Sequence, residues 1–228
     1  MEDDPYYYLQ FGPGGVEGGG GDGDAASLAT PRGLHNLGPS YLSLDVDGRV
    51  VRLDSFSKVL APGLRLGWAT AAPPVAAKIA HHLHGVLLGA PALAQAVAVA
   101  LLSEWGEEGF ERHVCRVQRE YGRRAARLHA ALTRHAPPPL AFYTLPRAGM
   151  FIWVRLGGGV ADAGAALSSL TAARVCVVPG AYAHCSGDRS RPCPHLRLSF
   201  AGASDGEMEE GAARLGEALR KGGGGGEG

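Results

Sequence analysis

The sequence carries no excess of charge of either sign. Its 22 lysine and arginine residues balance 22 aspartate and glutamate residues in a chain of 228, so the formal net charge at pH 7 is zero. A neutral chain without a polybasic segment has no electrostatic field that would attract nucleic acid or an anionic membrane surface. We therefore expect neither nucleic acid nor a membrane among the partners of this protein.

Long uninterrupted apolar runs are also lacking. The apolar stretch at residues 86–102 is interrupted by Gly89, Pro91 and Gln95, and it is shorter than the roughly 20 residues that a membrane-spanning helix needs. It is predicted to be a buried helix instead. Residues 2–4 are acidic, which is the wrong charge for an export or transit segment. The expected location is intracellular, either cytoplasmic or mitochondrial.

Cysteines are few and irregularly spaced. The four are Cys115, Cys176, Cys185 and Cys193. A chain of this length with such spacing does not fit a small disulfide scaffold, so we expect reduced thiols in an intracellular protein. His184 and His195 lie near two of these cysteines, but the spacing fits no common zinc motif. No metal site is predicted.

Segments with strand character alternate with segments of helical character. Strands are expected at residues 41–53 (two strands around an Asp-Gly turn), 64–70, 150–154, 175–178 and 196–200, and the end of a strand at 6–11. Helices are expected from residue 73 and at 86–102, 104–135, 161–172 and 205–219. This alternation predicts the α/β or α+β class.

Glycine is concentrated in two low-complexity segments. Residues 12–33 contain chance matches to glycine-loop patterns, but no strand precedes them and no helix follows directly, so a phosphate-binding role is not indicated. They are predicted to be a flexible insertion. Residues 222–228 are predicted to be a disordered tail.

One lysine lies in an unusual setting. Lys58 follows a mostly apolar run at residues 50–53, with Ser55 and Ser57 just before it and Arg65 after a Pro-Gly turn. A lysine in a partly dry pocket can attack a carbonyl and form a Schiff base. The two hydroxyls and the guanidinium can hold a phosphate, as a site for pyridoxal 5'-phosphate (PLP) requires. An ordinary surface lysine with two turn hydroxyls is the alternative.

Several segments, in the same order, resemble the class I/II aminotransferases, which are PLP-dependent enzymes of fold type I. The resemblance is strongest to the kynurenine/2-aminoadipate aminotransferase branch. The matching segments are residues 2–7 (Glu-Asp-Asp-Pro-Tyr-Tyr), 54–58 with 62–67, 104–110 with His113 and Arg116, 149–153, 178–180 and 196–200. They cover nearly the whole chain except the glycine-rich insertion and the tail.

The resemblance implies roles for residues near the cofactor ring. Lys58 would form the Schiff base and then move a proton between the substrate Cα and the cofactor. Asp3 would pair with the pyridine nitrogen and keep it protonated. Tyr6 would donate to the phenolic oxygen, and Pro5 belongs to the same cofactor motif. Taken alone, Asp3 could be a solvated terminal acid and Tyr6 a packed tyrosine.

The resemblance also implies two anion-binding groups. Ser55, Ser57 and Arg65 would bind the cofactor phosphate. Arg197 would bind the substrate α-carboxylate through its planar, bidentate guanidinium, which orients the Cα–H bond. The simpler interpretation of Arg197 is a charge at the surface of a strand.

The implied fold is the C-terminal part of a PLP-dependent transferase. Residues 1–103 would form a partial large PLP-binding domain with the insertion at 12–33. Residues 104–221 would form the interdomain helix and an α+β small domain, and 222–228 the tail. Family members have a substantial segment before the Asp-Asp-Pro-Tyr motif, so the chain is expected to be an N-terminally truncated fragment. We expect that residues 1–228 alone neither bind PLP tightly nor catalyse amino transfer.

The implied activity is amino transfer between an amino acid, of the 2-aminoadipate or kynurenine kind, and a 2-oxo acid, in a homodimer. Two alternatives remain open at this stage. One is a lyase or synthase of the same fold that uses the same lysine. The other is an inactive or noncatalytic aminotransferase-like fragment that acts as a binding module.

Overall fold

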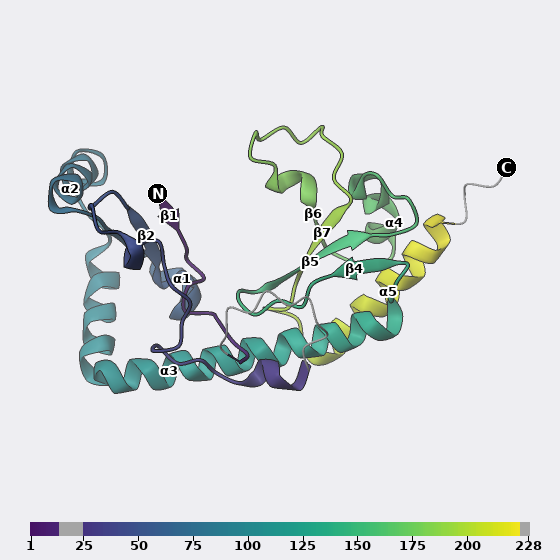
Figure 1. The fold of residues 1–228 in the computed structure, drawn as a ribbon, viewed down its shortest axis with the longest axis horizontal. Coiled ribbons are helices and arrows are strands. Elements are labelled where there is room, and N and C mark those ends of the chain that lie inside the picture. Colours follow the sequence, from purple (N-terminus) through teal and green to yellow (C-terminus); the bar gives the residue numbers. More distant parts are fainter. Residues whose placement is uncertain (14–24, 224–228) are drawn as a thin grey trace. The chain divides into compact units, whose positions relative to one another are not determined.

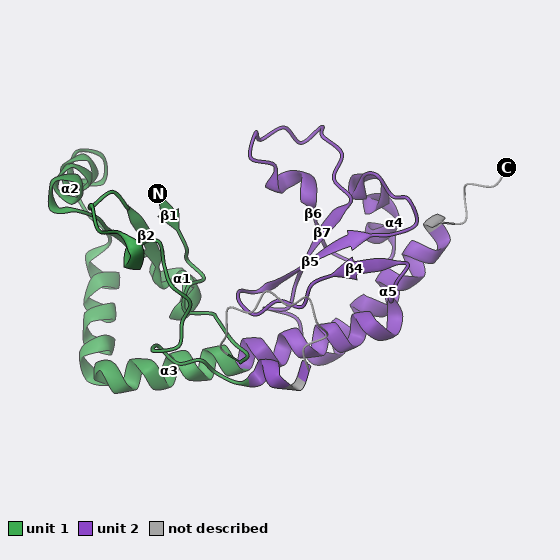
Figure 2. Cartoon of the chain, viewed as in Figure 1, with its two compact units in different colours: residues 1–16, 30–119 green, residues 17–29, 120–228 purple. Residues whose placement is uncertain are grey.

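The computed structural model describes residues 1–13 and 25–223 (Figure 1). Two compact units form: residues 1–16 with 30–119, called unit 1, and residues 17–29 with 120–228, called unit 2 (Figure 2). The division falls inside helix α3 (Ala92–His135), further along the chain than the boundary predicted at residues 103 and 104. Part of the predicted insertion, residues 14–24, lies outside the described residues, as do residues 224–228 of the predicted tail.

Unit 1 contains a three-stranded sheet in the order β1-β2-β3. Its strands are β1 (Glu2–Asp3), β2 (Arg52–Ser55) and β3 (Gly67–Thr70). Strand β1 runs parallel to β2, and β3 runs antiparallel to it. Its helices are α1 (Phe56–Val59), α2 (Pro73–Leu87) and the first part of α3, with 3₁₀ turns at Leu42–Leu44 (η2) and Pro62–Leu64 (η3).

The predicted strand end at residues 6–11 is wrong, because β1 ends at Asp3. The Asp4 carboxylate accepts the backbone N–H of Tyr6 at 3.2 Å, and Pro5 has no N–H to offer to a neighbouring strand. Burial raises the pKa of Asp4, and the hydrogen bond from Tyr6 opposes that shift. A turn therefore replaces the strand directly after β1.

The first of the two strands predicted at residues 41–53 is also wrong. Residues 42–44 form the 3₁₀ turn η2, and the Asp45 carboxylate accepts backbone N–H groups from Asp47 (3.2 Å), Arg49 (3.1 Å) and Val50 (2.7 Å). These hydrogen bonds, led by the one from Val50, lower the pKa of Asp45. A carboxylate that binds its own backbone in this way favours a turn over a strand.

A buried charged group joins β1 to β2. The Arg52 guanidinium donates to both carboxylate oxygens of Asp54 at 2.8 Å and to Glu2 at 3.3 Å, and its Cζ lies 4.1 Å from the centre of the Tyr7 ring. The three charged side chains are at most 9% exposed. Such a cluster is stable only when every member keeps its partners.

The apolar residues 86–102 do not form the predicted buried helix. Helix α2 ends at Leu87, Leu88 takes a left-handed conformation (φ 60°), and α3 begins at Ala92, after Pro91. Many of the apolar side chains here are exposed: Val86, Leu87, Leu88, Leu93, Val97 and Val99. The apolar composition of the segment predicted a buried helix, but the structure divides it between two helices, and burial depends on a covering surface that the described residues do not provide. None of the described helices combines the length and apolar character needed to span a membrane.

Helix α3 is longer than the helix predicted at residues 104–135, because it starts at Ala92. At Gly106 the backbone leaves helical geometry (φ 58°, ψ −170°). A positive φ of this kind is readily adopted only by glycine, so Gly106 is the kink between the two helical stretches.

Unit 2 contains a four-stranded antiparallel sheet in the order β4-β5-β7-β6. Its strands are β4 (Ala141–Tyr143), β5 (Phe151–Leu156), β6 (Val178–Pro179) and β7 (His195–Ser199). Helix α5 (Asp205–Gly223) and the end of α3 lie along one side of it (Figure 1). Strand β4 was not predicted, and α5 includes two residues of the predicted tail.

Alternate residues of the two central strands face the core of unit 2. Ile152, Val154 and Leu156 of β5 are buried, as are Leu196 and Leu198 of β7, while the residues between them are more exposed. This period of two is typical of a sheet with one covered face. Helix α5 packs closely at Gly216, where a Cβ atom would lie 1.9 Å from the carbonyl oxygen of His135.

We predict that Arg52→Met destabilises unit 1 by about 3–5 kcal/mol, because Glu2 and Asp54 are left as buried, unpaired carboxylates. Urea titration with hydrogen-exchange mass spectrometry of residues 52–70 measures this. The control is Arg49→Met. Arg49 has an 83% exposed side chain paired with Asp47 at 3.1 Å, and its loss costs less than about 1 kcal/mol. Equal stability of the two variants would contradict the prediction.

A second prediction concerns acid and unit 2. Arg123 donates to Asp205 at 2.9 Å and to Glu120 at 3.0 Å, and hydrogen bonds from Arg123 are the largest cause of the lowered pKa of both carboxyls. A lowered pKa stabilises the folded state above the unfolded value, 3.8 for Asp205, and this contribution is lost as the pH falls through the folded value. Stability of unit 2 therefore falls below about pH 4.5.

Arg123→Met removes the largest source of this pH dependence. The variant should have a lower Tm at pH 6 and a smaller drop in Tm between pH 6 and pH 3 than the unmodified protein. Thermal unfolding followed by circular dichroism at both pH values measures the two drops. An equal drop in Tm for the two proteins would show that Arg123 does not control the pH dependence of the stability of unit 2.

Candidate active site

One edge of the unit 1 sheet collects most of the predicted site residues. Parallel strands β1 and β2 end at the same edge, and the start of antiparallel β3 lies there as well, because Ser55 pairs with Gly67. Ligands of α/β proteins commonly bind outside the carboxyl ends of parallel strands. The residues gathered at this edge are Asp3, Pro5 and Tyr6 after β1, Ser55, Ser57 and Lys58 after β2, and Arg65 before β3.

Strands β2 and β3 approach closely at this edge. A Cβ atom on Gly67 would lie 2.6 Å from the backbone oxygen of Asp54, so glycine is required for the backbones to meet. Asp54 is also the residue whose carboxylate holds Arg52. The buried charge cluster and the site edge thus share one residue.

Lys58 lies on the single turn of helix α1. Ser55 caps this helix, since its Oγ accepts the backbone N–H of Ser57 at 3.1 Å. The Lys58 side chain is half-buried, and its Nζ lies 5.7 Å from the centre of the Tyr6 ring, within the range of a cation–π contact. The amine and the phenol ring predicted to act together are therefore neighbours.

Two hydroxyls and a guanidinium lie together beside Lys58. Ser55 Oγ is 2.9 Å from Ser57 Oγ, and Arg65 Nη1 donates to Ser57 Oγ at 3.3 Å. Arg65 has a left-handed backbone (φ 50°) at the end of turn η3 and also donates to the Pro62 carbonyl at 3.0 Å. Its own turn therefore directs the exposed guanidinium toward the serines. The set is suited to binding an anion.

The two aspartates after Glu2 differ in their surroundings. The Asp3 side chain is exposed and has no hydrogen bond or ion pair with any of the described residues. Asp4 is occupied by the N–H of Tyr6. Asp3 is therefore the carboxylate available to a ligand at this edge.

Arg197 belongs to unit 2 and lies on the exposed face of β7. It pairs across the strands with Trp153 of β5, and its Cζ lies 4.2 Å from the centre of the Phe151 ring. Trp153 in turn stacks on His195 at 5.5 Å. Sequence reasoning identified Arg197 but missed this aromatic surround, which depends on the register of two strands.

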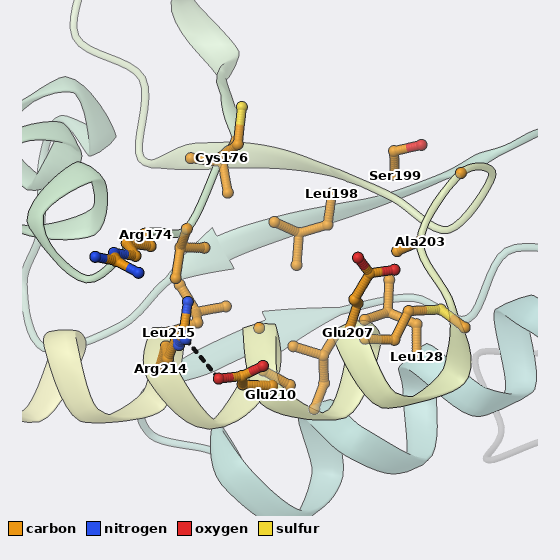
Figure 3. A pocket seen from close by; sticks show the side chains of 17 residues that line it. Leu128, Arg174, Cys176, Leu198, Ser199, Ala203, Glu207, Glu210, Arg214 and Leu215 are labelled. Atoms are coloured by element: carbon orange, nitrogen blue, oxygen red, sulfur yellow. Dashed lines mark hydrogen bonds and ion pairs between the residues drawn. The ribbon is translucent and has the colours of Figure 1, made fainter.

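A pocket of about 480 Å³ lies on the other side of the same sheet (Figure 3). Its lining includes Leu198 of β7, Arg174, and two residues of α5, Glu210 and Arg214. The Arg214 guanidinium forms an ion pair with the Glu210 carboxylate at 2.5 Å. Leu198 and Arg197 are successive strand residues, so their side chains point to opposite faces. None of the predicted site residues lines this pocket.

No metal centre is formed by residues 1–13 and 25–223, where no group of three or more histidine, cysteine, aspartate or glutamate side chains could hold an ion. Cys193 is buried with its Sγ 3.7 Å from His195 Nδ1. The four cysteines are free thiols.

Comparison with known proteins places these residues in a family. Residues 16–215 match the family model "Aminotransferase class I and II". The mitochondrial kynurenine/alpha-aminoadipate aminotransferase of Bos taurus is 34% identical over 222 residues, which cover 97% of this chain and 46% of that protein. Aminotransferase swnA of Metarhizium robertsii is 35% identical over 246 residues, with coverage of 96% and 46%.

Solved structures agree with the sequence relatives. Aminotransferase Aro8 from Candida albicans has a TM-score of 0.79 and 28% identity, covering 96% of this chain and 49% of that one. LysN, an alpha-aminoadipate aminotransferase from Thermus thermophilus complexed with N-(5'-phosphopyridoxyl)-L-leucine, has a TM-score of 0.77 and 32% identity with the same coverage.

The chain spans about half the length of the relatives that it matches. The resemblance and the fold class predicted from the sequence are confirmed. The chain belongs to the class I and II aminotransferase family.

Proposed function

We propose that this chain carries the cofactor-binding lysine of a PLP-dependent aminotransferase, which transfers the amino group of an amino acid to a 2-oxo acid. The observation that carries the proposal is the grouping of Lys58 with Ser55, Ser57 and Arg65 at one sheet edge. An amine beside an anion-binding set matches a ligand that has both an aldehyde and a phosphate.

The residues present fit PLP in their chemistry. Ser55, Ser57 and Arg65 would bind the phosphate, Asp3 the pyridine nitrogen and Tyr6 the phenolic oxygen. When bound, PLP supplies an aldehyde carbon and a ring that accepts electrons from the substrate Cα. A negative charge on Asp3 would keep the pyridine nitrogen protonated.

Lys58 and Arg197 would act on the substrate. The Lys58 amine, once displaced by the substrate, would take the Cα proton on Nζ and return it. Arg197 would bind the α-carboxylate with two parallel N–H groups. Its guanidinium is supported from one side by the Phe151 ring, which favours a single orientation of the bound carboxylate.

The relatives support a substrate class. Of the relatives described above, two are named for alpha-aminoadipate, and one of these also for kynurenine. We propose an amino acid with a long dicarboxylic or an aromatic side chain. Assembly into a homodimer remains a prediction, and so does the cellular compartment of the protein. The mitochondrial name of the bovine relative supports an intracellular location.

The first test uses the small number of lysines. The sequence contains three, Lys58, Lys78 and Lys221, and the last two are exposed. We predict that PLP followed by borohydride labels Lys58 roughly tenfold more than either of the others, because phosphate contacts strengthen binding only there. Condensation of amine and aldehyde releases water, and borohydride reduces the C=N bond to a stable C–N bond. Peptide mass spectrometry counts the adducts.

Lys58→Arg is the matched variant, since it keeps the charge but cannot form the adduct. It should leave only the weak labelling at Lys78 and Lys221. Labelling that follows exposure, with Lys58 no higher than the exposed lysines, would contradict the proposed function.

A further prediction separates the phosphate from the rest of the cofactor. Arg65→Ala should weaken PLP binding at Lys58 about tenfold, the loss expected for a charge-assisted hydrogen bond, and leave binding of pyridoxal, which has no phosphate, unchanged. Adduct formation at Lys58 as a function of ligand concentration measures both affinities. Arg49→Ala, at an exposed ion pair of the same unit, should change neither. Equal losses for PLP and pyridoxal would argue against a phosphate role.

A further inference from the structure

A histidine of helix α3 contacts the segment that carries Lys58. His113 Nε2 lies 2.6 Å from the backbone oxygen of Val59, the residue after Lys58. The other ring nitrogen, Nδ1, lies 3.0 Å from Arg116 Nη2, and the ring stacks on Trp105 with centres 4.8 Å apart. These three residues belong to the segment at 104–116, to which no role has yet been given.

The two contacts define the state of the His113 ring. A carbonyl oxygen only accepts hydrogen bonds, so Nε2 must carry a proton and donate to Val59. A guanidinium only donates, so Nδ1 accepts from Arg116 and carries no proton. Both contacts are satisfied by the tautomer that carries its proton on Nε2, and stacking on Trp105 restricts rotation of the ring.

Helix α1 is so short that its carbonyl groups need hydrogen-bond donors from outside the helix. It has four residues, and its last carbonyls cannot all find partners inside the helix. The Leu60 and Ala61 N–H groups both donate to the Phe56 carbonyl, at 2.9 and 3.2 Å. The Val59 carbonyl instead accepts from His113, while the Val59 side chain is buried.

We propose that His113 is a positioning residue for Lys58. Its Nε2–H fixes the Val59 carbonyl, and through the backbone of α1 this fixes the direction in which the Lys58 side chain leaves the helix. Arg116 and Trp105 hold the ring in place. The inference rests on the proposed function for the role of Lys58, but the contact itself is testable without a cofactor.

The test compares His113→Gln with His113→Met. Both keep a side chain of similar length in the same space, but only glutamine has an N–H that can reach the Val59 carbonyl. Without any cofactor, hydrogen exchange of the Leu60 and Ala61 amides should be about tenfold faster in the Met variant and near the unmodified rate in the Gln variant, since a lost hydrogen bond allows α1 to open. Arg112→Met, at an exposed ion pair with Glu108, is the control and should show no change.

The second readout is borohydride trapping of PLP, with Lys78 and Lys221 as internal references. The ratio of Lys58 adduct to the reference adducts should fall about tenfold in the Met variant and be largely restored in the Gln variant. A general loss of structure would raise exchange throughout unit 1 and abolish the difference between the three lysines in both variants.

Two results would overturn the inference. One is equal exchange of the α1 amides in the Gln and Met variants. The other is an unchanged Lys58 ratio in a Met variant whose exchange has increased, because the contact would then hold α1 without positioning the lysine. Failure of the proposed function looks different, since the unmodified protein would then show no preference for Lys58.

Discussion

The guanidinium of Arg52 joins β1 to β2 through the carboxylates of Glu2 and Asp54, and the position of Asp3 and Tyr6 beside the residues that follow β2 depends on that junction. The same Glu2 carboxylate accepts the N–H groups of Tyr41 and Leu42 at 3.1 Å, so it also anchors turn η2. Strand β1 is only two residues long. Two ladder residues alone would hold it weakly, and the buried ion pairs supply the remaining restraint.

Alignment of β1 with β2 in turn brings the candidate site residues to one edge of the sheet. Asp3 and Tyr6 come from the end of one strand, and Ser55 to Lys58 from the end of the next. The register of the two strands aligns Asp3 with Leu53, while Tyr6 lies on the turn after β1 and Lys58 on helix α1 directly after β2. Rigid elements hold a site more precisely than loops do, and here the lysine has a second support from helix α3.

The sequence was sufficient for the parts of the site that depend on local chemistry. The Ser-Lys segment, the Pro-Gly turn and Arg65 are close in the chain, and their hydrogen bonds are local ones. The predictions were wrong where distant residues decide the outcome. Residues 41–44 have strand-like composition, but the Asp45 carboxylate and Glu2, about 40 residues away, fold them into a turn. The contact of His113 with Val59 spans 54 residues and leaves no periodic signal.

Burial was the least predictable property. Residues 86–102 have the composition of a core helix, yet several of their apolar side chains are exposed, because a hydrophobic pattern reports what a segment can bury and not whether a surface is present to bury it. In β5 and β7 alternate residues are buried, because α5 and the end of α3 cover one face of their sheet. The aromatic surround of Arg197 required the strand register, which sequence alone did not provide.

The close approach at Gly67 also limits how this site can evolve. Any substitution there adds a Cβ atom, which would lie 2.6 Å from the Asp54 backbone oxygen. The end of a flexible side chain could rotate away from such a contact, but a backbone atom of a strand cannot. Accommodation would have to separate β3 from β2, shifting Ser55 away from its partner and pulling Asp54 against Arg52. Amino-acid substitutions at position 67 are therefore disfavoured, although Gly67 contributes no side chain to the candidate site.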